Sequence, residues 1–113
     1  MSDKTHALTL GEGVTVEGDV WVNSGTYMGA VENTTVTVKI EEEAKVNGNV
    51  GLNAIRGGTI IGENSGIITD EMMGCADGDN STAKMTNKRG GEVGALDGFS
   101  KGEDATMTII NEG

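Results

Sequence analysis

The sequence predicts an all-β protein, and three observations lead to this prediction. Apolar and polar residues alternate in short runs at 8–10, 14–22 and 36–40, and a period of two is typical of half-buried strands. Val, Thr and Ile dominate these runs, and these residues favour the pleated surface of a sheet. Glycines separate the runs as turn residues, and no segment shows the period of 3.6 that indicates a helix.

The remaining strands follow from the same pattern. Residues 57–69 contain two Ile-Ile pairs separated by a polar turn, and each pair predicts a short strand. Residues 70–91 are mixed in character and predict a long loop or arm, with one short strand at 83–86. Two last strands are expected at 92–96 and 105–111. The whole chain, residues 1–113, is expected to form a single β domain.

Residues 10–20 and 40–50 have similar sequences at an offset of 30 positions, with Val16 matching Val46 and Val20 matching Val50. Two similar hairpins in one antiparallel β-sandwich or barrel would give this echo, and we favour that fold because a solenoid needs three or more repeats. The alternative is a short β-helix or solenoid, in which each repeat covers the open face of its neighbour.

The phrase Val16-Glu-Gly-Asp-Val20 resembles the coil repeats of bactofilins, which are cytosolic β-helical filament proteins. The resemblance covers two short stretches, within 10–20 and 40–50, and does not continue as tandem repeats beyond residue 70. It implies a β-helical fold and assembly into filaments.

The composition indicates a protein whose folding is linked to assembly. Aromatic residues make up 3% of the chain, which has 19 glycines and no proline. Few large rings leave a thin core, and many glycines increase the backbone entropy lost on folding. Burial against other subunits would compensate for both. We therefore expect a homo-oligomer, with a trimer favoured.

The formal net charge of −10 limits the partners that the chain can bind. Such a surface repels nucleic acids and anionic membranes, so neither is expected as a partner. A larger protein assembly with a basic surface fits better. The single cysteine forms no intrachain disulfide, and the first residues lack a signal-peptide pattern. We expect synthesis in the cytoplasm and, in the decoration role considered below, a place in a virion.

No group of residues indicates catalysis or a cofactor. His6 is the only histidine, and Cys75 lies among acidic residues, which raise the pKa of a thiol. Neither belongs to a recognisable nucleophile–base arrangement. We therefore expect no enzyme activity, no catalytic residue and no cofactor.

A possible calcium loop begins at Asp77, with Asp79 and Ser81 at the right spacing. Thr82 stands where the loop requires glycine, and Lys88 where it requires glutamate. An ordinary acidic turn is the better interpretation, and no metal site is expected.

These observations predict a non-enzymatic structural subunit that oligomerises and docks on a larger assembly, such as a viral capsid decoration protein. One alternative is an acidic inhibitor in which Glu41–Glu43 imitate nucleic-acid phosphates. The other is a cytosolic β-helical filament protein. Large and flexible apolar side chains commonly anchor interfaces. The interface candidates are Trp21, Tyr27, Met72 and Met73.

Overall fold

The computed structural model describes residues 4–24 and 33–113, and the regular structure in this part of the chain is entirely β. The strands are β1 (Lys4–Leu10), β2 (Thr15–Glu17), β3 (Val20–Asn23), β4 (Thr34–Ile40), β5 (Lys45–Asn47), β6 (Val50–Ile55), β7 (Thr59–Asn64), β8 (Ile67–Asp77), β9 (Thr82–Asn87), β10 (Glu92–Lys101) and β11 (Thr106–Asn111).

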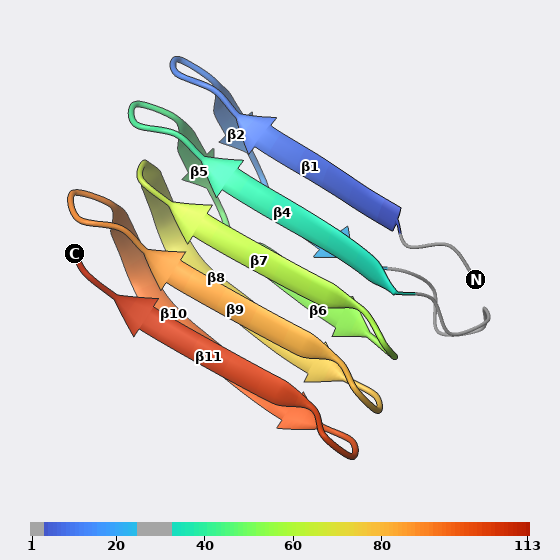
Figure 1. Cartoon of the computed structure of the whole chain (residues 1–113). Helices are drawn as coiled ribbons and strands as arrows, with labels where there is room; N and C mark the ends of the chain where they lie inside the picture. Colours follow the sequence, from blue (N-terminus) through green and yellow to red (C-terminus); the bar gives the residue numbers. More distant parts are fainter. Residues whose placement is uncertain (1–3, 25–32) are drawn as a thin grey trace.

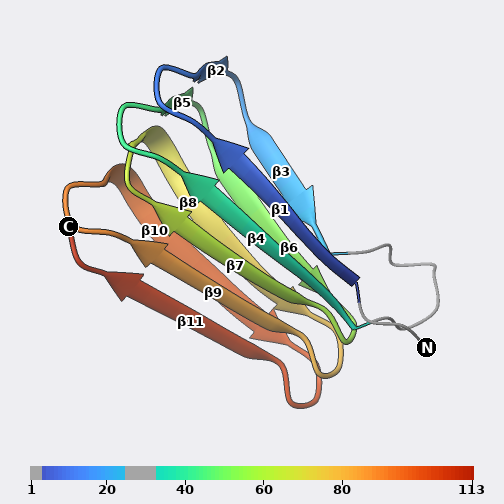
Figure 2. The same ribbon diagram turned by 45° about the horizontal axis from the view of Figure 1, so that its top comes forward.

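The chain winds as a parallel β-solenoid (Figures 1 and 2). Sheet A has the strand order β1-β4-β7-β9-β11, and sheet B stacks β2 and β3 on β5 and β6, then β8, then β10. Each rung passes once through sheet A and once through sheet B before the chain advances to the next rung. Every strand pairing in the described residues is parallel.

The all-β prediction is confirmed, but the antiparallel sandwich or barrel is wrong, and the alternative solenoid is the observed fold. Alternation with period two shows that one face of a strand is buried, and it does so equally for parallel and antiparallel pairing. Parallel sheets usually show continuous apolar runs because helices cover both faces. Here one face of each sheet is open, so the strands keep the alternating pattern.

The 30-residue echo is the register between the first two rungs. Leu10 pairs with Ile40 in sheet A, and Val16 and Val20 pair with Val46 and Val50 in sheet B. The echo therefore reports neighbouring rungs and not two separate hairpins.

Later rungs do not keep this offset. Thr35 pairs with Thr59, 24 positions further on, whereas Lys45 pairs with Ile67, 22 positions further on. The two offsets differ because the turn at 65–66 is two residues shorter than the turn at 41–44.

The expectation of a long loop or arm at 70–91 is corrected by the structure. This segment contains most of β8, a turn, the whole of β9 and a second turn. The short strand expected at 83–86 lies within β9. Glycine and acidic residues interrupt the apolar alternation in β8, and this hid the strand in the sequence. Gly74 is nevertheless an inward position, since a Cβ atom there would meet the side chains of Met107 and Met85.

The core lies between the two sheets and is built from columns of side chains, one from each rung. One column contains Leu8, Val38, Gly62, Met85 and Ile109. Its middle members are almost completely buried, with Val38 1% and Met85 0% exposed. At Gly62, the side chains of Leu52 and Met72 fill the space that a Cβ atom would occupy. Large and small residues thus alternate to fill a thin core.

Three asparagines form a ladder at one corner of the core, on successive rungs. The amide of Asn64 donates to Asn87 Oδ1 at 3.0 Å, and the amide of Asn87 donates to Asn111 Oδ1 at 3.1 Å. Asn87 is 3% exposed and also donates to the carbonyl of Gly91. The ladder satisfies polar groups at the turn and holds the last rungs in register.

We expect Asn87→Ala to destabilise the protein by about 2–3 kcal/mol, because it leaves buried hydrogen-bonding groups without their partner. Asn111→Ala is the matched control. It removes the exposed end of the same ladder, and we expect it to cost less than about 1 kcal/mol. Urea unfolding followed by circular dichroism measures both. Equal losses for the two variants would show that the ladder does not stabilise the rungs in this way.

Candidate functional site

The outer faces of the two sheets differ in chemistry. Side chains alternate between the core and the outside along each strand, so the register assigns each outward side chain to a column. On sheet A, one outward column consists entirely of threonine, namely Thr5, Thr35, Thr59, Thr82 and Thr106. The charged residues in the neighbouring outward columns are Lys39, Glu63 and Lys84. This face is polar and nearly neutral.

The outer face of sheet B carries exposed aromatic rings and acidic groups. Trp21 is 57% exposed and Phe99 is 61% exposed. They lie in adjacent outward columns: Trp21 with Gly51, Met73 and Asp97, and Phe99 with Asn23, Asn53 and Cys75. We call the side chains of Trp21, Met73, Cys75 and Phe99 the sheet B patch. It runs obliquely across the sheet from the first rung to the fourth.

Gly51 explains how Trp21 lies on the sheet. The indole atoms Cε3 and Cζ3 occupy the position where a Cβ atom of residue 51 would be. The ring therefore rests on the backbone of the second rung and remains accessible to solvent. In the adjacent outward column, Asn23 and Asn53 are held together by a hydrogen bond of 3.0 Å, in which the amide of Asn53 donates to Asn23 Oδ1.

Cys75 is the buried member of the sheet B patch, at 7% exposure, beside Phe99 in the register. Burial raises the pKa of its thiol, the negative charge of Asp77 raises it further, and Lys101 acts in the opposite direction. A thiol with a raised pKa is a poor nucleophile near neutral pH. Cys75 thus contributes apolar surface to the patch.

The interface candidates from the sequence separate in the structure. Trp21 and Met73 lie in the same outward column of sheet B. Met72 points the other way and is 0% exposed in the core, which fits a packing role. Tyr27 lies outside the described residues. Sequence reasoning missed Phe99, and its position after the turn-like Asp97-Gly98 gave no sign that it belongs to a long strand, β10.

A second candidate site is formed by the two ends of the solenoid. The core column described above ends on exposed side chains, with Leu8 38% exposed in β1 and Ile109 41% exposed in β11. β11 pairs only with β9 within the described chain, so its outer edge presents backbone donors and acceptors. Such an edge is a template for pairing with another strand.

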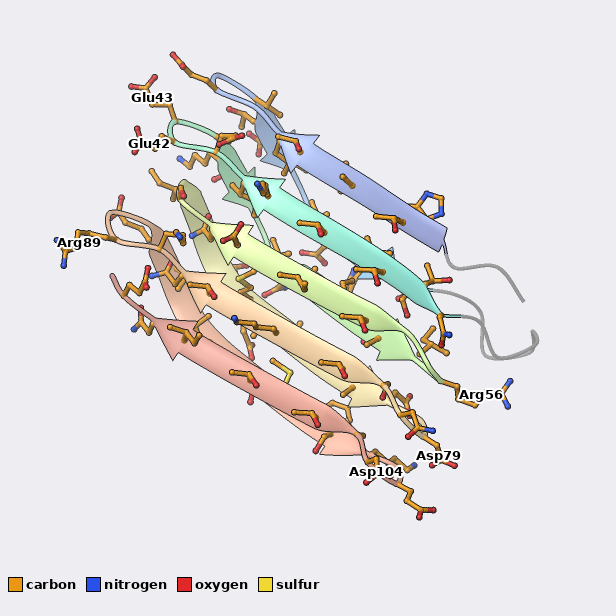
Figure 3. The ribbon with its side chains drawn as sticks, viewed as in Figure 1. Glu42, Glu43, Arg56, Asp79, Arg89 and Asp104 are labelled. Carbon is orange, nitrogen blue, oxygen red and sulfur yellow. The ribbon has the colours of Figure 1, made fainter. Side chains whose placement is uncertain are left out.

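Charged residues project from the turns at both edges of the sheets (Figure 3). Glu42, Glu43 and Arg89 extend from one edge. Here the short turn at 65–66 leaves a hollow of about 480 Å³, lined by Gly11, Glu12, Glu41, Glu42 and Ser65. Its carboxylates would repel an anionic ligand.

Arg56, Asp79 and Asp104 extend from the opposite edge (Figure 3). Asp79 Oδ1 accepts a hydrogen bond of 2.9 Å from the backbone amide of Glu103. Within the suggested calcium loop, Asp79 thus lies in a tight turn that stacks on the next rung, whereas Asp77 ends β8 and Lys88 follows β9. In the described part of the chain, no group of three or more His, Cys, Asp or Glu residues is placed to hold a metal ion.

His6 and Cys75 are not brought together. His6 lies on β1 in sheet A, opposite Val36, whereas Cys75 lies on the outer face of sheet B. Residues 4–24 and 33–113 include no helix that could cross a membrane.

No family model matches the chain, and no curated protein and no solved structure is similar to it. Its functional interpretation therefore depends on the surfaces of the solenoid.

We expect Gly51→Ala to displace the indole of Trp21, because the new methyl group would occupy the place of Cε3 and Cζ3. The only tryptophan of the chain then reports the change directly. Its fluorescence emission or its quenching by acrylamide should change, while the far-ultraviolet circular dichroism stays that of a β protein. Gly11→Ala is the control, since a Cβ atom there meets nothing within 4 Å. Unchanged fluorescence in Gly51→Ala would contradict the described position of the ring.

Proposed function

We propose that this protein is a non-enzymatic structural subunit that assembles through the ends of its solenoid. The observation that supports this proposal best is the inward column that ends on Leu8 and Ile109, whose equivalents in the middle rungs are fully buried. A solenoid rung gains stability chiefly by covering its neighbour. A copy of the same chain offers an end of matching width and spacing, so stacking would bury both side chains and pair the free backbone edge.

Head-to-tail stacking would set β1 of one copy beside β11 of the next. In that register Leu8 would meet Ile109, and Thr5 would extend the threonine column that ends at Thr106. This contact joins two different surfaces, so repetition produces an open filament unless the rotation closes a ring. The solenoid fold therefore favours the filament alternative.

Decoration of a larger assembly, such as a viral capsid, is the second candidate function. The exposed sheet B patch favours it, because Trp21 and Phe99 are large apolar side chains outside the core. A closed trimer in solution would support this function, and an open-ended distribution of masses would support the filament. A stable monomer or dimer would favour the acidic inhibitor instead.

We expect Ile109→Lys to abolish self-association, because it places a charge at the exposed end of the core column. Ile110→Lys is the matched control on the same strand. Residue 110 faces outward in the column that contains Lys39 and Glu63, where a lysine is already accommodated. Light scattering across a concentration series should show large species for the wild-type chain and Ile110→Lys, and monomers for Ile109→Lys.

Circular dichroism of both variants is the control for correct folding. A wild-type chain that remains monomeric at every concentration would overturn assembly through the ends. So would an Ile109→Lys variant that assembles as well as the control.

A further inference from the structure

We infer that the outer face of sheet B docks a basic segment of a partner protein, with Trp21 and Phe99 as its anchors. This inference names the partner chemistry for the docking role among the proposed functions and rests on that role. It does not depend on stacking of the solenoid ends, because the patch faces sideways from the solenoid and not along it.

The first support is charge complementarity confined to one face. The strands of sheet B carry six carboxylates outside the core, against two amines. They are Glu17, Asp70, Glu71, Asp77, Glu92 and Asp97, against Lys45 and Lys101. The strands of sheet A carry one carboxylate against three amines, namely Glu63 against Lys4, Lys39 and Lys84. A basic segment is therefore attracted to sheet B and not to sheet A.

The second support is the chemistry of the patch itself. An exposed indole attracts cations through its π face, and arginine uses this contact more often than lysine. The ring of Trp21 already rests on Gly51, so little side-chain freedom remains to be lost on binding. Met73 adds polarizable apolar surface two rungs further along the same column. Apolar contact at the centre with carboxylates around it matches the usual anatomy of a binding surface.

The third support is the size of the patch. Trp21 and Phe99 are three rungs apart along the solenoid and two residues apart along the strands. With strands about 4.8 Å apart and a rise of about 3.3 Å per residue, this separation is roughly 16 Å. An extended segment of about five residues spans it. The face thus suits a short extended basic segment, whereas the net charge of −10 opposes nucleic acid and anionic lipid.

The experiment measures binding of a fluorescently labelled nona-arginine peptide to the Ile109→Lys variant. This variant is expected to be monomeric, so it tests docking on sheet B without assembly at the ends. If the peptide does not bind, the docking inference fails and the filament proposal is unaffected. Fluorescence anisotropy gives the affinity, and the emission of Trp21 shows whether the peptide reaches the patch. We expect saturable binding, a change in Trp21 emission, and no binding of a nona-glutamate peptide.

Two sets of variants test the location of the site. Trp21→Leu and Phe99→Ala should each weaken binding about 10-fold, since each removes an anchor. The double variant Glu71→Gln/Asp97→Asn should weaken it several-fold. Glu42→Gln/Glu43→Gln is the matched control, because it removes the same charge at a turn outside sheet B, and it should change the affinity less than 2-fold.

Three outcomes would overturn the inference. If the two double variants weaken binding equally, the peptide responds to net charge and not to the sheet B face. If the peptide binds without changing Trp21 emission, the site lies elsewhere. If maltohexaose binds in place of the peptide and alters Trp21 emission, the face recognises a neutral sugar chain.

Discussion

Parallel hydrogen bonding between successive rungs is the interaction on which the rest of the structure depends. A single rung, such as β4 with β5 and β6, encloses no core and is stabilised only by the rungs on either side. The core columns, the asparagine ladder and the stacked turns all follow from this pairing. The same dependence leaves the ends incomplete, because β11 has a free edge within the described chain. The proposed assembly through the ends would therefore use the same interaction that stabilises the rungs.

The fixed register also organises the outside of the protein. Parallel in-register pairing places equivalent positions of successive rungs side by side at about 4.8 Å, so a residue type that recurs in each rung becomes a continuous stripe. Threonine recurs in this way from Thr5 to Thr106 on sheet A. On sheet B the stripes are mixed, and Gly51 interrupts one of them where the ring of Trp21 lies. The two faces can thus have separate roles on one scaffold.

The sequence alone predicted the β class. It also contained the register of the first two rungs, since Val16 and Val20 repeat as Val46 and Val50, but the favoured interpretation of this repeat, two antiparallel hairpins, was wrong. It did not predict the later rungs, since the offset falls to 24 in sheet A and then, after the shorter turn at 65–66, to 22 in sheet B. A search of the sequence for repeats of one fixed length does not find rungs whose lengths differ in this way. The sequence named Trp21 and Met73 but could not separate Met73 from Met72, because adjacent residues of a strand face opposite sides. That distinction requires the register, which comes only from tertiary pairing.

Charge affects the two proposed surfaces in opposite ways. Stacking of ends brings together copies that each carry a formal charge of −10, so electrostatic repulsion opposes it and added salt, by screening, favours it. Burial of Leu8 and Ile109, which does not depend on screening, supplies the attraction. Docking of a basic segment on sheet B uses attraction between opposite charges, so the same salt weakens its long-range part. A basic partner bound along sheet B would neutralise some of the repulsion between stacked copies. Docking on sheet B would thereby favour stacking at the ends, and the acidic charge would couple the two surfaces without any change in the fold.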